Sequence, residues 1–155
     1  MDALAGFIVF QTKAGVDVGI NLQNFYAEES RTYLGRTFAW AGFGYSGASV
    51  DLNATNTEAQ LGFAITPLTI TTAKQAAEQE WLVEVNTVWI NPDTMQETTD
   101  RLTEIYTVTS YRSDTRTLTM NLSSPLDAQS AEIPSRVLTA RMVGQLPATG
   151  QVSLI

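Results

Sequence analysis

The segment Trp81–Ile90 limits the fold most, because its side chains alternate as they do along a β-strand. One face of the expected strand carries Trp81, Val83, Val85, Thr87 and Trp89, and the other carries Leu82, Glu84, Asn86, Val88 and Ile90. Turn residues at Asn91–Asp93 end it. Beyond that turn, Leu102–Arg112 and Arg116–Leu122 are predicted to form a hairpin around Ser113–Thr115. The second half of the chain is therefore predicted to be strongly β.

Shorter strands are predicted on both sides of this region. They are Phe7–Phe10, Gly15–Ile20, Thr37–Gly47 with a bulge or kink near Gly42, Ala48–Leu52, Ala59–Ile65, Val137–Val143 and a terminal extended piece Val152–Ile155. We expect the first two to pair as a hairpin, and the polar residues 53–57 to form a turn. Residues 26–36 carry mixed charges with no period, and we interpret them as a loop.

One short helix is predicted over residues 72–80. Thr72 and Gln75 have the spacing of a capping box, and Ala73, Ala76 and Ala77 share one helical face. No composition break or repeat divides the chain, so residues 1–155 are expected to form one domain. The predicted class is mainly β, an antiparallel β-sandwich or barrel with this one helix.

Composition excludes several kinds of chemistry. The 155 residues include no cysteine and no histidine, which excludes disulfides, thiolate ligands, cysteine nucleophiles and histidine triads. Only 16% of the residues are charged, and the net charge is −7. Such a chain lacks the basic patches that nucleic acid requires, and it has no apolar run of about 18 residues to cross a membrane. We expect no nucleic-acid specificity, no membrane segment, no cofactor and no metal.

Four weaker patterns have competing interpretations. Carboxylate pairs such as Asp93/Glu97 and Asp100/Glu104 could act on glycans, but no distinctive motif surrounds them. The oxygen-rich residues 91–100 lack the central glycine of a calcium loop. The glycine spacing of residues 42–47 matches that of a dinucleotide-binding motif. That motif requires a helix to follow, whereas a strand is expected here. Aromatic residues alternate at Phe38, Trp40, Phe43 and Tyr45, which indicates core or an interface patch.

Two short motifs in the last third carry a family resemblance. Leu122–Ala128 reads Leu-Ser-Ser-Pro-Leu-Asp-Ala, and Ile133–Arg136 reads Ile-Pro-Ser-Arg. Following a hairpin, they resemble a step and loop of phage tail-tip and baseplate hub proteins, including minor tail proteins of lambda-like phages and hub proteins of gene transfer agents. Several lambda-like relatives carry a cysteine-rich part that binds an iron–sulfur cluster, and this chain has no cysteine to hold one.

The resemblance implies a structural virion protein, not an enzyme. It would form a homo-oligomeric hub or adaptor ring between the tail tube and the distal spike, in contact with other tail and baseplate proteins. A trimer is the favoured symmetry and a hexamer the alternative, and assembly would take place in the host cytoplasm. The residues expected to shape the loop or an interface are Pro125, Leu126, Asp127, Ile133, Pro134 and Arg136.

Two other functions compete with this one. A carbohydrate- or peptidoglycan-acting domain could use paired carboxylates, with Trp40 and Tyr45 lining a sugar groove. A β-sandwich adhesion module is the third alternative.

Overall fold

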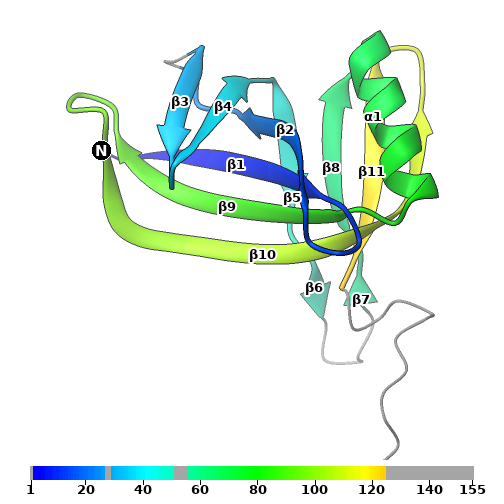
Figure 1. Cartoon of the computed structure of the whole chain (residues 1–155). Helices are drawn as coiled ribbons and strands as arrows, with labels where there is room; N and C mark the ends of the chain where they lie inside the picture. Colours follow the sequence, from blue (N-terminus) through cyan, green and yellow to red (C-terminus); the bar gives the residue numbers. More distant parts are fainter. Residues whose placement is uncertain (1, 27–28, 51–55, 125–155) are drawn as a thin grey trace, which may run out of the picture.

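The computed structural model describes residues 2–26, 29–50 and 56–124, and these are mainly β-strand with one helix, as predicted (Figure 1). The elements are β1 (Ala3–Gln11), β2 (Asp17–Gln23), β3 (Ser30–Tyr33), β4 (Arg36–Trp40), β5 (Phe43–Ser46), β6 (Ser49–Val50), β7 (Asn56–Thr57), β8 (Ala59–Ala64), α1 (Pro67–Glu78), β9 (Leu82–Asn91), β10 (Gln96–Ser113) and β11 (Thr117–Ser123).

Nine of the described strands belong to one sheet. Their order is β3-β4-β2-β1-β9-β10-β11-β8-β5, and the sheet is not closed into a barrel. All neighbours are antiparallel except β2 and β4, which run parallel and pair Leu22 with Ala39. β6 and β7 form a separate two-stranded ladder. In Figure 1, β3 and β4 lie over one end of the long strands, and α1, β8 and β11 lie at the other end.

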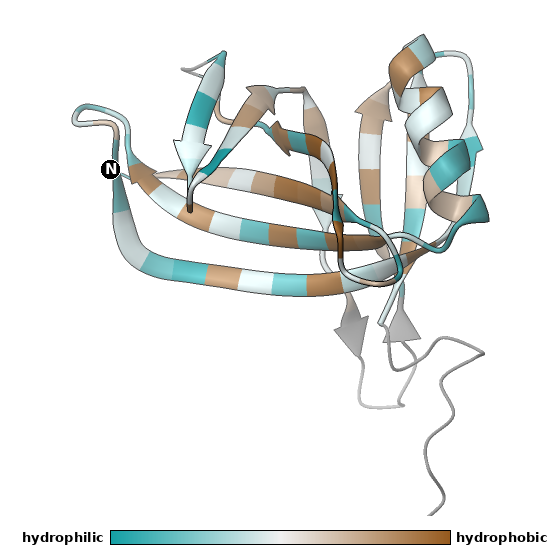
Figure 2. Ribbon diagram, in the orientation of Figure 1, coloured by the Kyte–Doolittle hydropathy of each residue, from teal (hydrophilic) through white to brown (hydrophobic). Residues whose placement is uncertain are grey.

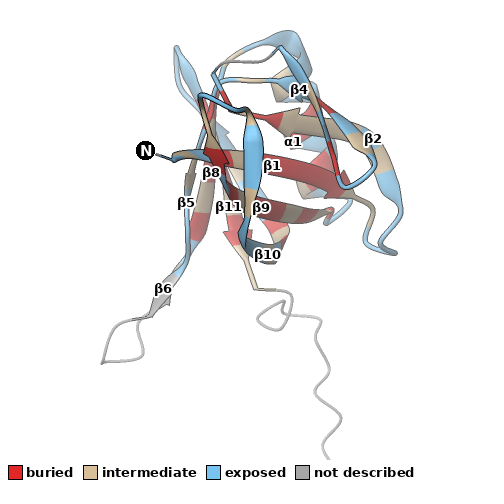
Figure 3. Cartoon of the chain, turned by 90° about the vertical axis from the view of Figure 1, so that its left-hand side faces the viewer, coloured by how far each residue is buried: buried red, intermediate tan, exposed pale blue. Residues whose placement is uncertain are grey.

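β1 is the centre of the molecule, because both of its faces are buried. It pairs with β9 along its whole length, from Ala3 opposite Ile90 to Gln11 opposite Leu82. Its residues alternate between two separate hydrophobic cores. Figure 3 shows most of the strand as buried. A strand buried on both faces needs an apolar run rather than simple alternation, and Phe7–Phe10 supplies it.

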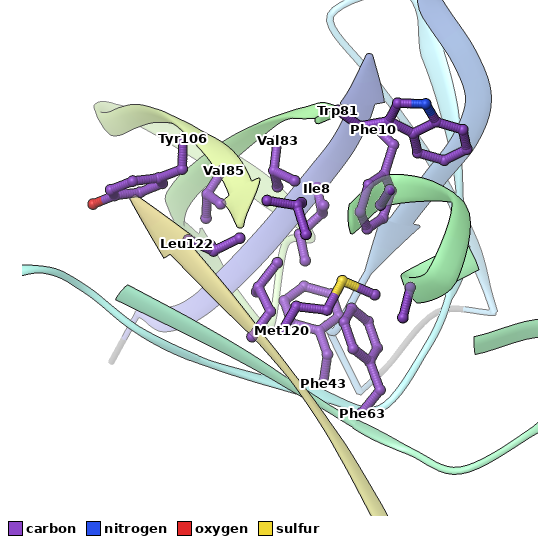
Figure 4. Close-up of a cluster of buried hydrophobic side chains, with 14 of the residues drawn as sticks. Ile8, Phe10, Phe43, Phe63, Trp81, Val83, Val85, Tyr106, Met120 and Leu122 are labelled. Atoms are coloured by element: carbon purple, nitrogen blue, oxygen red, sulfur yellow. The ribbon is translucent and has the colours of Figure 1, made fainter. Parts of the chain in front are cut away.

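The first core lies between β1, β9, β10, β11, β8, β5 and α1 (Figure 4). Its buried members are Ile8, Phe10, Phe43, Ala59, Leu61, Phe63, Ala73, Ala76, Trp81, Val83, Val85, Tyr106, Val108, Leu118, Met120 and Leu122. Leu118, Met120 and Leu122 alternate along β11 and form the inward face of the β10–β11 hairpin, where all three are completely buried.

The second core lies on the opposite face of β1 and is rich in aromatic side chains. It contains Ala5, Phe7, Val9, Phe25, Tyr33, Phe38, Val88 and Ile90. The ring of Phe7 stacks on that of Tyr33 with centroids 4.5 Å apart, and it meets Phe38 edge-on at 5.1 Å. Such pairs add to the hydrophobic free energy gained by burial. The β3–β4 hairpin therefore covers this core.

β9 contributes to both cores, with residues near its start in the first core and residues near its end in the second. Val83 and Val85 face the first core, whereas Val88 and Ile90 face the second. The two faces predicted for Trp81–Ile90 are thus confirmed, and Figure 2 shows the alternation along the strand. Each face of β9 is covered at one end and uncovered at the other.

Some local predictions are wrong. Residues 26–36 were expected to form a loop, but they include β3, where only Tyr33 of four residues is buried and no apolar period is visible. The helix begins at Pro67 rather than near residue 72. Thr66 caps it by accepting from the Thr69 backbone N–H at 3.1 Å, and Pro67 suits the first helical position. Thr72 is instead buried within the helix.

Other local predictions are corrected, confirmed or lie outside the described residues. The kinked strand predicted over Thr37–Gly47 is instead divided near Gly42 into β4 and β5, which are not neighbours in the sheet. The side chain of Asp114 accepts from the backbone of Arg116 and Thr117, both at 2.8 Å, which closes the predicted hairpin turn and lowers the pKa of its carboxyl. The strand Val137–Val143 and the extended piece Val152–Ile155 lie outside the described residues.

Gly6 is where β5 crosses β1. A Cβ at this position would lie 3.2 Å from Cε2 of Phe43 and 3.3 Å from Oδ1 of Asn24. That same Oδ1 accepts from the Gly6 backbone N–H at 2.7 Å, while Nδ2 of Asn24 donates to the Phe43 carbonyl at 3.3 Å. Asn24 therefore joins β1 to β5, and a Cβ at Gly6 would force Phe43 or Asn24 to shift.

The substitution Gly6→Val is expected to lower the free energy of unfolding by about 1–3 kcal/mol, because its methyl groups would overlap Phe43 and Asn24. Urea unfolding measures this. Gly44→Val is the matched control, since no atom lies within 4 Å of a Cβ at that position. Equal stability of the two variants would contradict this view of the crossing.

Candidate functional site

Three exposed apolar side chains form a row on the uncovered face of the long strands. Leu4 on β1 lies directly opposite Trp89 on β9, and Leu102 on β10 lies opposite Thr87, diagonal to Trp89. Their exposed fractions are 60%, 39% and 52%. The apolar row, as we call Leu4, Trp89 and Leu102, backs directly onto the second core on the other side of the sheet. The row crosses three neighbouring strands, β1, β9 and β10.

The corresponding surface behind the first core is mostly polar. Glu84 accepts from Gln11 at 3.2 Å and from Asn86 at 2.8 Å, and Thr103 donates to Asn86 at 2.6 Å. These four residues form the polar row, with exposed Ile105 beside it. A polar network is the usual way to finish the outer face of a sheet. The apolar row departs from this arrangement on the same strands.

A cluster of Tyr45, Glu104 and Tyr106 borders the apolar row. The Tyr45 phenol donates to Oε2 of Glu104 at 2.8 Å, and the Tyr106 phenol donates to Oε1 at 2.8 Å. The two phenol oxygens lie 3.0 Å apart. Figure 4 shows Tyr106 at the margin of the first core, with its oxygen directed away from the other side chains. Since Leu102 and Glu104 are two positions apart on β10, they share one face.

The environment of the cluster keeps both phenols protonated. Burial and the hydrogen bonds with Tyr106 and Glu104 raise the pKa of Tyr45 far above its usual value. Burial also raises the pKa of Tyr106, although hydrogen bonds from Tyr45 and the Ala48 backbone oppose the rise. Both phenols remain hydrogen-bond donors to the carboxylate of Glu104. The arrangement ties β5 to β10 and can fix the edge of the apolar row.

The sequence-predicted residues are only partly placed. Pro125, Leu126, Asp127, Ile133, Pro134 and Arg136 all lie outside the described residues. Of the alternating aromatic residues, Phe38 and Phe43 are core, Tyr45 belongs to the cluster, and Trp40 is exposed beside Gly42. The core alternative is therefore confirmed for Phe38 and Phe43, and the interface alternative stays a prediction for the other two positions.

The predicted carboxylate pairs have structural partners or unsuitable spacing. Glu97 forms an ion pair with Arg31 at 3.2 Å. Asp100 and Glu104 are four positions apart on an extended strand, which separates their backbones by about 13 Å. Glycosidases hold their two carboxylates roughly 5–9.5 Å apart. Glu97 is thus engaged by Arg31, and the backbones of Asp100 and Glu104 stand farther apart than such a carboxylate pair.

Searches for metal sites, membrane spans and relatives give little further indication. Within residues 2–26, 29–50 and 56–124, no group of three or more acidic residues is placed to hold a metal ion. The helix in this part of the chain is too short and too polar to span a membrane. Comparisons with known protein families and with curated protein sequences return no match to this chain.

The cluster predicts late ionisation of its two tyrosines. Tyr45 and Tyr106 should form phenolate only above the usual pH range of tyrosine on alkaline titration, as followed by ultraviolet difference spectroscopy. Above about pH 10 the unfolded chain loses these protons while the folded chain keeps them, so stability falls as pH rises. Tyr45→Phe should make that fall less steep.

The control for this titration is Tyr26→Phe, which removes an exposed phenol outside the cluster and should leave the late-titrating fraction in place. A single common titration of all five phenols near pH 10 would contradict the described hydrogen bonding.

Proposed function

We propose that this chain is a structural subunit of a phage tail tip or baseplate. In this proposal it forms a homo-oligomeric hub or adaptor ring between the tail tube and the distal spike. The observation that supports it is the apolar row, which leaves Leu4, Trp89 and Leu102 exposed across three strands. The motifs at Leu122–Ala128 and Ile133–Arg136 supply the tail-protein context by resemblance.

The apolar row has the character of a protein-binding patch. Tryptophan is enriched at the energetic centre of interfaces, and charged residues are depleted there. The three side chains stand on paired strands, so the backbone that carries them is already ordered before a partner covers them. On the opposite face of the same strands, the polar row satisfies its side chains with hydrogen bonds, and its Asn86 is buried. In the proposal, a neighbouring subunit of the ring covers the apolar row.

The double variant Leu4→Asp, Leu102→Asp tests this role. Both side chains are more than half exposed, so the substitutions should spare the fold while placing two charges in the proposed interface. Sedimentation velocity should show a ring-sized oligomer for the original chain and a monomer for the variant. Mass spectrometry of purified tails should detect the original chain and at least about tenfold less of the variant, the loss expected when more than 1.4 kcal/mol of contact is removed.

Leu68→Asp is the matched control, because Leu68 is equally exposed but lies on α1, outside the apolar row. It should assemble as the original chain does. A chain that stays monomeric and is absent from purified tails would overturn the proposal. Turnover of cell-wall glycan, abolished by Glu104→Gln, would support the carbohydrate-acting alternative instead.

A further inference from the structure

One edge of β10 is open in the described part of the chain. β10 pairs with β9 on one side as far as Thr107, whereas on its other side β11 pairs only with Thr107–Ser113. Ser124, the residue after β11, follows at the level of Tyr106. No strand of the described residues pairs with the outer side of Arg101–Ile105. We call this stretch the open edge, and Figure 1 shows β10 at the margin of the long strands.

The backbone groups of alternate residues point out of the open edge. The N–H of Val108 donates to the Trp81 carbonyl at 2.9 Å, so the backbone groups of Val108 face β9. Residues that face a partner strand alternate along an antiparallel ladder, and β10 pairs regularly with β9 from Arg101 onward. The groups that point outward are therefore those of Arg101, Thr103 and Ile105. Unpaired N–H and C=O groups on a sheet edge are a template for another strand.

The open edge is apolar on both faces and carries a cation at one end. Leu102 and Ile105 lie on opposite faces, and half of each side chain is exposed. Arg101 shares the face of Ile105 and forms no ion pair with a described residue. On that face Glu84 of β9 lies opposite Ile105, and no described cation pairs with its carboxylate. The cation and the carboxylate therefore stand at opposite ends of the open edge.

We propose that the open edge pairs with the open edge of a second copy of this chain, antiparallel and about a two-fold axis at Thr103. In this register Thr103 stands opposite the partner's Thr103, and Arg101 stands opposite the partner's Ile105. Each outward residue then exchanges its N–H and C=O groups with an outward residue of the partner. A two-fold contact uses the same surface on both copies and is the commonest symmetry of soluble oligomers.

Charge complementarity favours a second copy as the occupant. An antiparallel copy brings its cationic end to the end that carries the carboxylate. The partner's Arg101 would stand beside Ile105, and Glu84 lies one strand further on the same face. Two strand spacings, about 10 Å, separate these two residues, and their long side chains can bridge that distance across Ile105. The arginine stem would then cover the exposed Ile105, and the two-fold axis repeats the ion pair.

The charges also select the register. Two-fold symmetry allows the axis to pass through Arg101, Leu102, Thr103 or Glu104. An axis at Arg101 or at Glu104 would set two like charges directly opposite each other, and an axis at Leu102 would set Glu104 opposite the partner's Asp100. Like charges in opposite positions destabilise a strand pair. With the axis at Thr103, no like charges stand opposite each other along the open edge.

The chain has no cysteine, so introduced thiols report this register directly. On mild oxidation of the full chain, Thr103→Cys should form a disulfide-linked dimer, because opposite hydrogen-bonded residues have Cα atoms about 5.5 Å apart. Arg101→Cys and Ile105→Cys should each link at least about tenfold more slowly, because each thiol is four residues, about 13 Å, from its copy along the strand.

A mixture of Arg101→Cys and Ile105→Cys should link at a rate close to that of Thr103→Cys, because the register sets these two positions opposite each other. Equal rates for the three single variants, with no gain on mixing, would overturn the proposal. The absence of a disulfide-linked dimer from Thr103→Cys would also overturn it.

Charge reversal in the Thr103→Cys background tests the electrostatic part. Arg101→Glu should slow cross-linking at least about tenfold, because it sets an anion near the partner's Glu84. Arg112→Glu is the matched control, since it makes the same charge change at an exposed position outside the open edge and should leave the rate unchanged. Adding Ile105→Lys to the Arg101→Glu variant should restore cross-linking, because lysine then stands opposite the new glutamate. Equal slowing by both glutamates would contradict the proposed pairing.

This pairing stands apart from the proposed tail function, because its test measures a covalent link at Thr103 and not incorporation into tails. A ring-sized oligomer that gives no Thr103→Cys dimer would overturn the pairing and leave the proposed function in place. A Thr103→Cys dimer of a chain that is absent from purified tails would do the reverse.

Discussion

The burial of β1 on both faces is the constraint on which the rest of the structure depends. Ile8 and Phe10 hold the first core, while Phe7 and Val9 hold the second, and all four are completely buried. Burying a large apolar side chain contributes about 1.5–3 kcal/mol, so this short run stabilises both halves of the molecule. Neither the β3–β4 hairpin nor the β8–β11 region can keep its core if β1 is displaced.

The same constraint accounts for the proposed interface. Because the cores lie on opposite faces of the long strands, each core leaves an outer face behind it. One outer face carries the polar row, with its hydrogen-bonded Glu84 and Asn86. The other carries Leu4, Trp89 and Leu102, which no described element covers.

Period-two alternation identified β9 but placed the start of β10 at Leu102 instead of Gln96, and it could not reveal the contacts between distant elements. The alternation of side chains in Trp81–Ile90 predicted both faces of β9. β3 was hidden because Tyr33 is its only buried residue, and the helix start was misplaced because Thr66 and Thr69 form the cap instead of Thr72 and Gln75. Tyr45 and Glu104 are 59 residues apart, and no local pattern links them. The apolar row is exposed because other elements cover only the opposite end of that sheet face. This coverage depends on tertiary packing, which local sequence patterns do not show.

Native-state hydrogen exchange tests the two-sided role of β1 most directly. If β1 holds both cores, buried amides at Phe38 in the second core and Phe63 in the first should exchange with the same free energy as Ile8 and Val9, equal to that of global unfolding. The two cores would then open only together. Exchange of Phe38 at a markedly lower free energy, while Phe63 and Ile8 stay protected, would contradict this account.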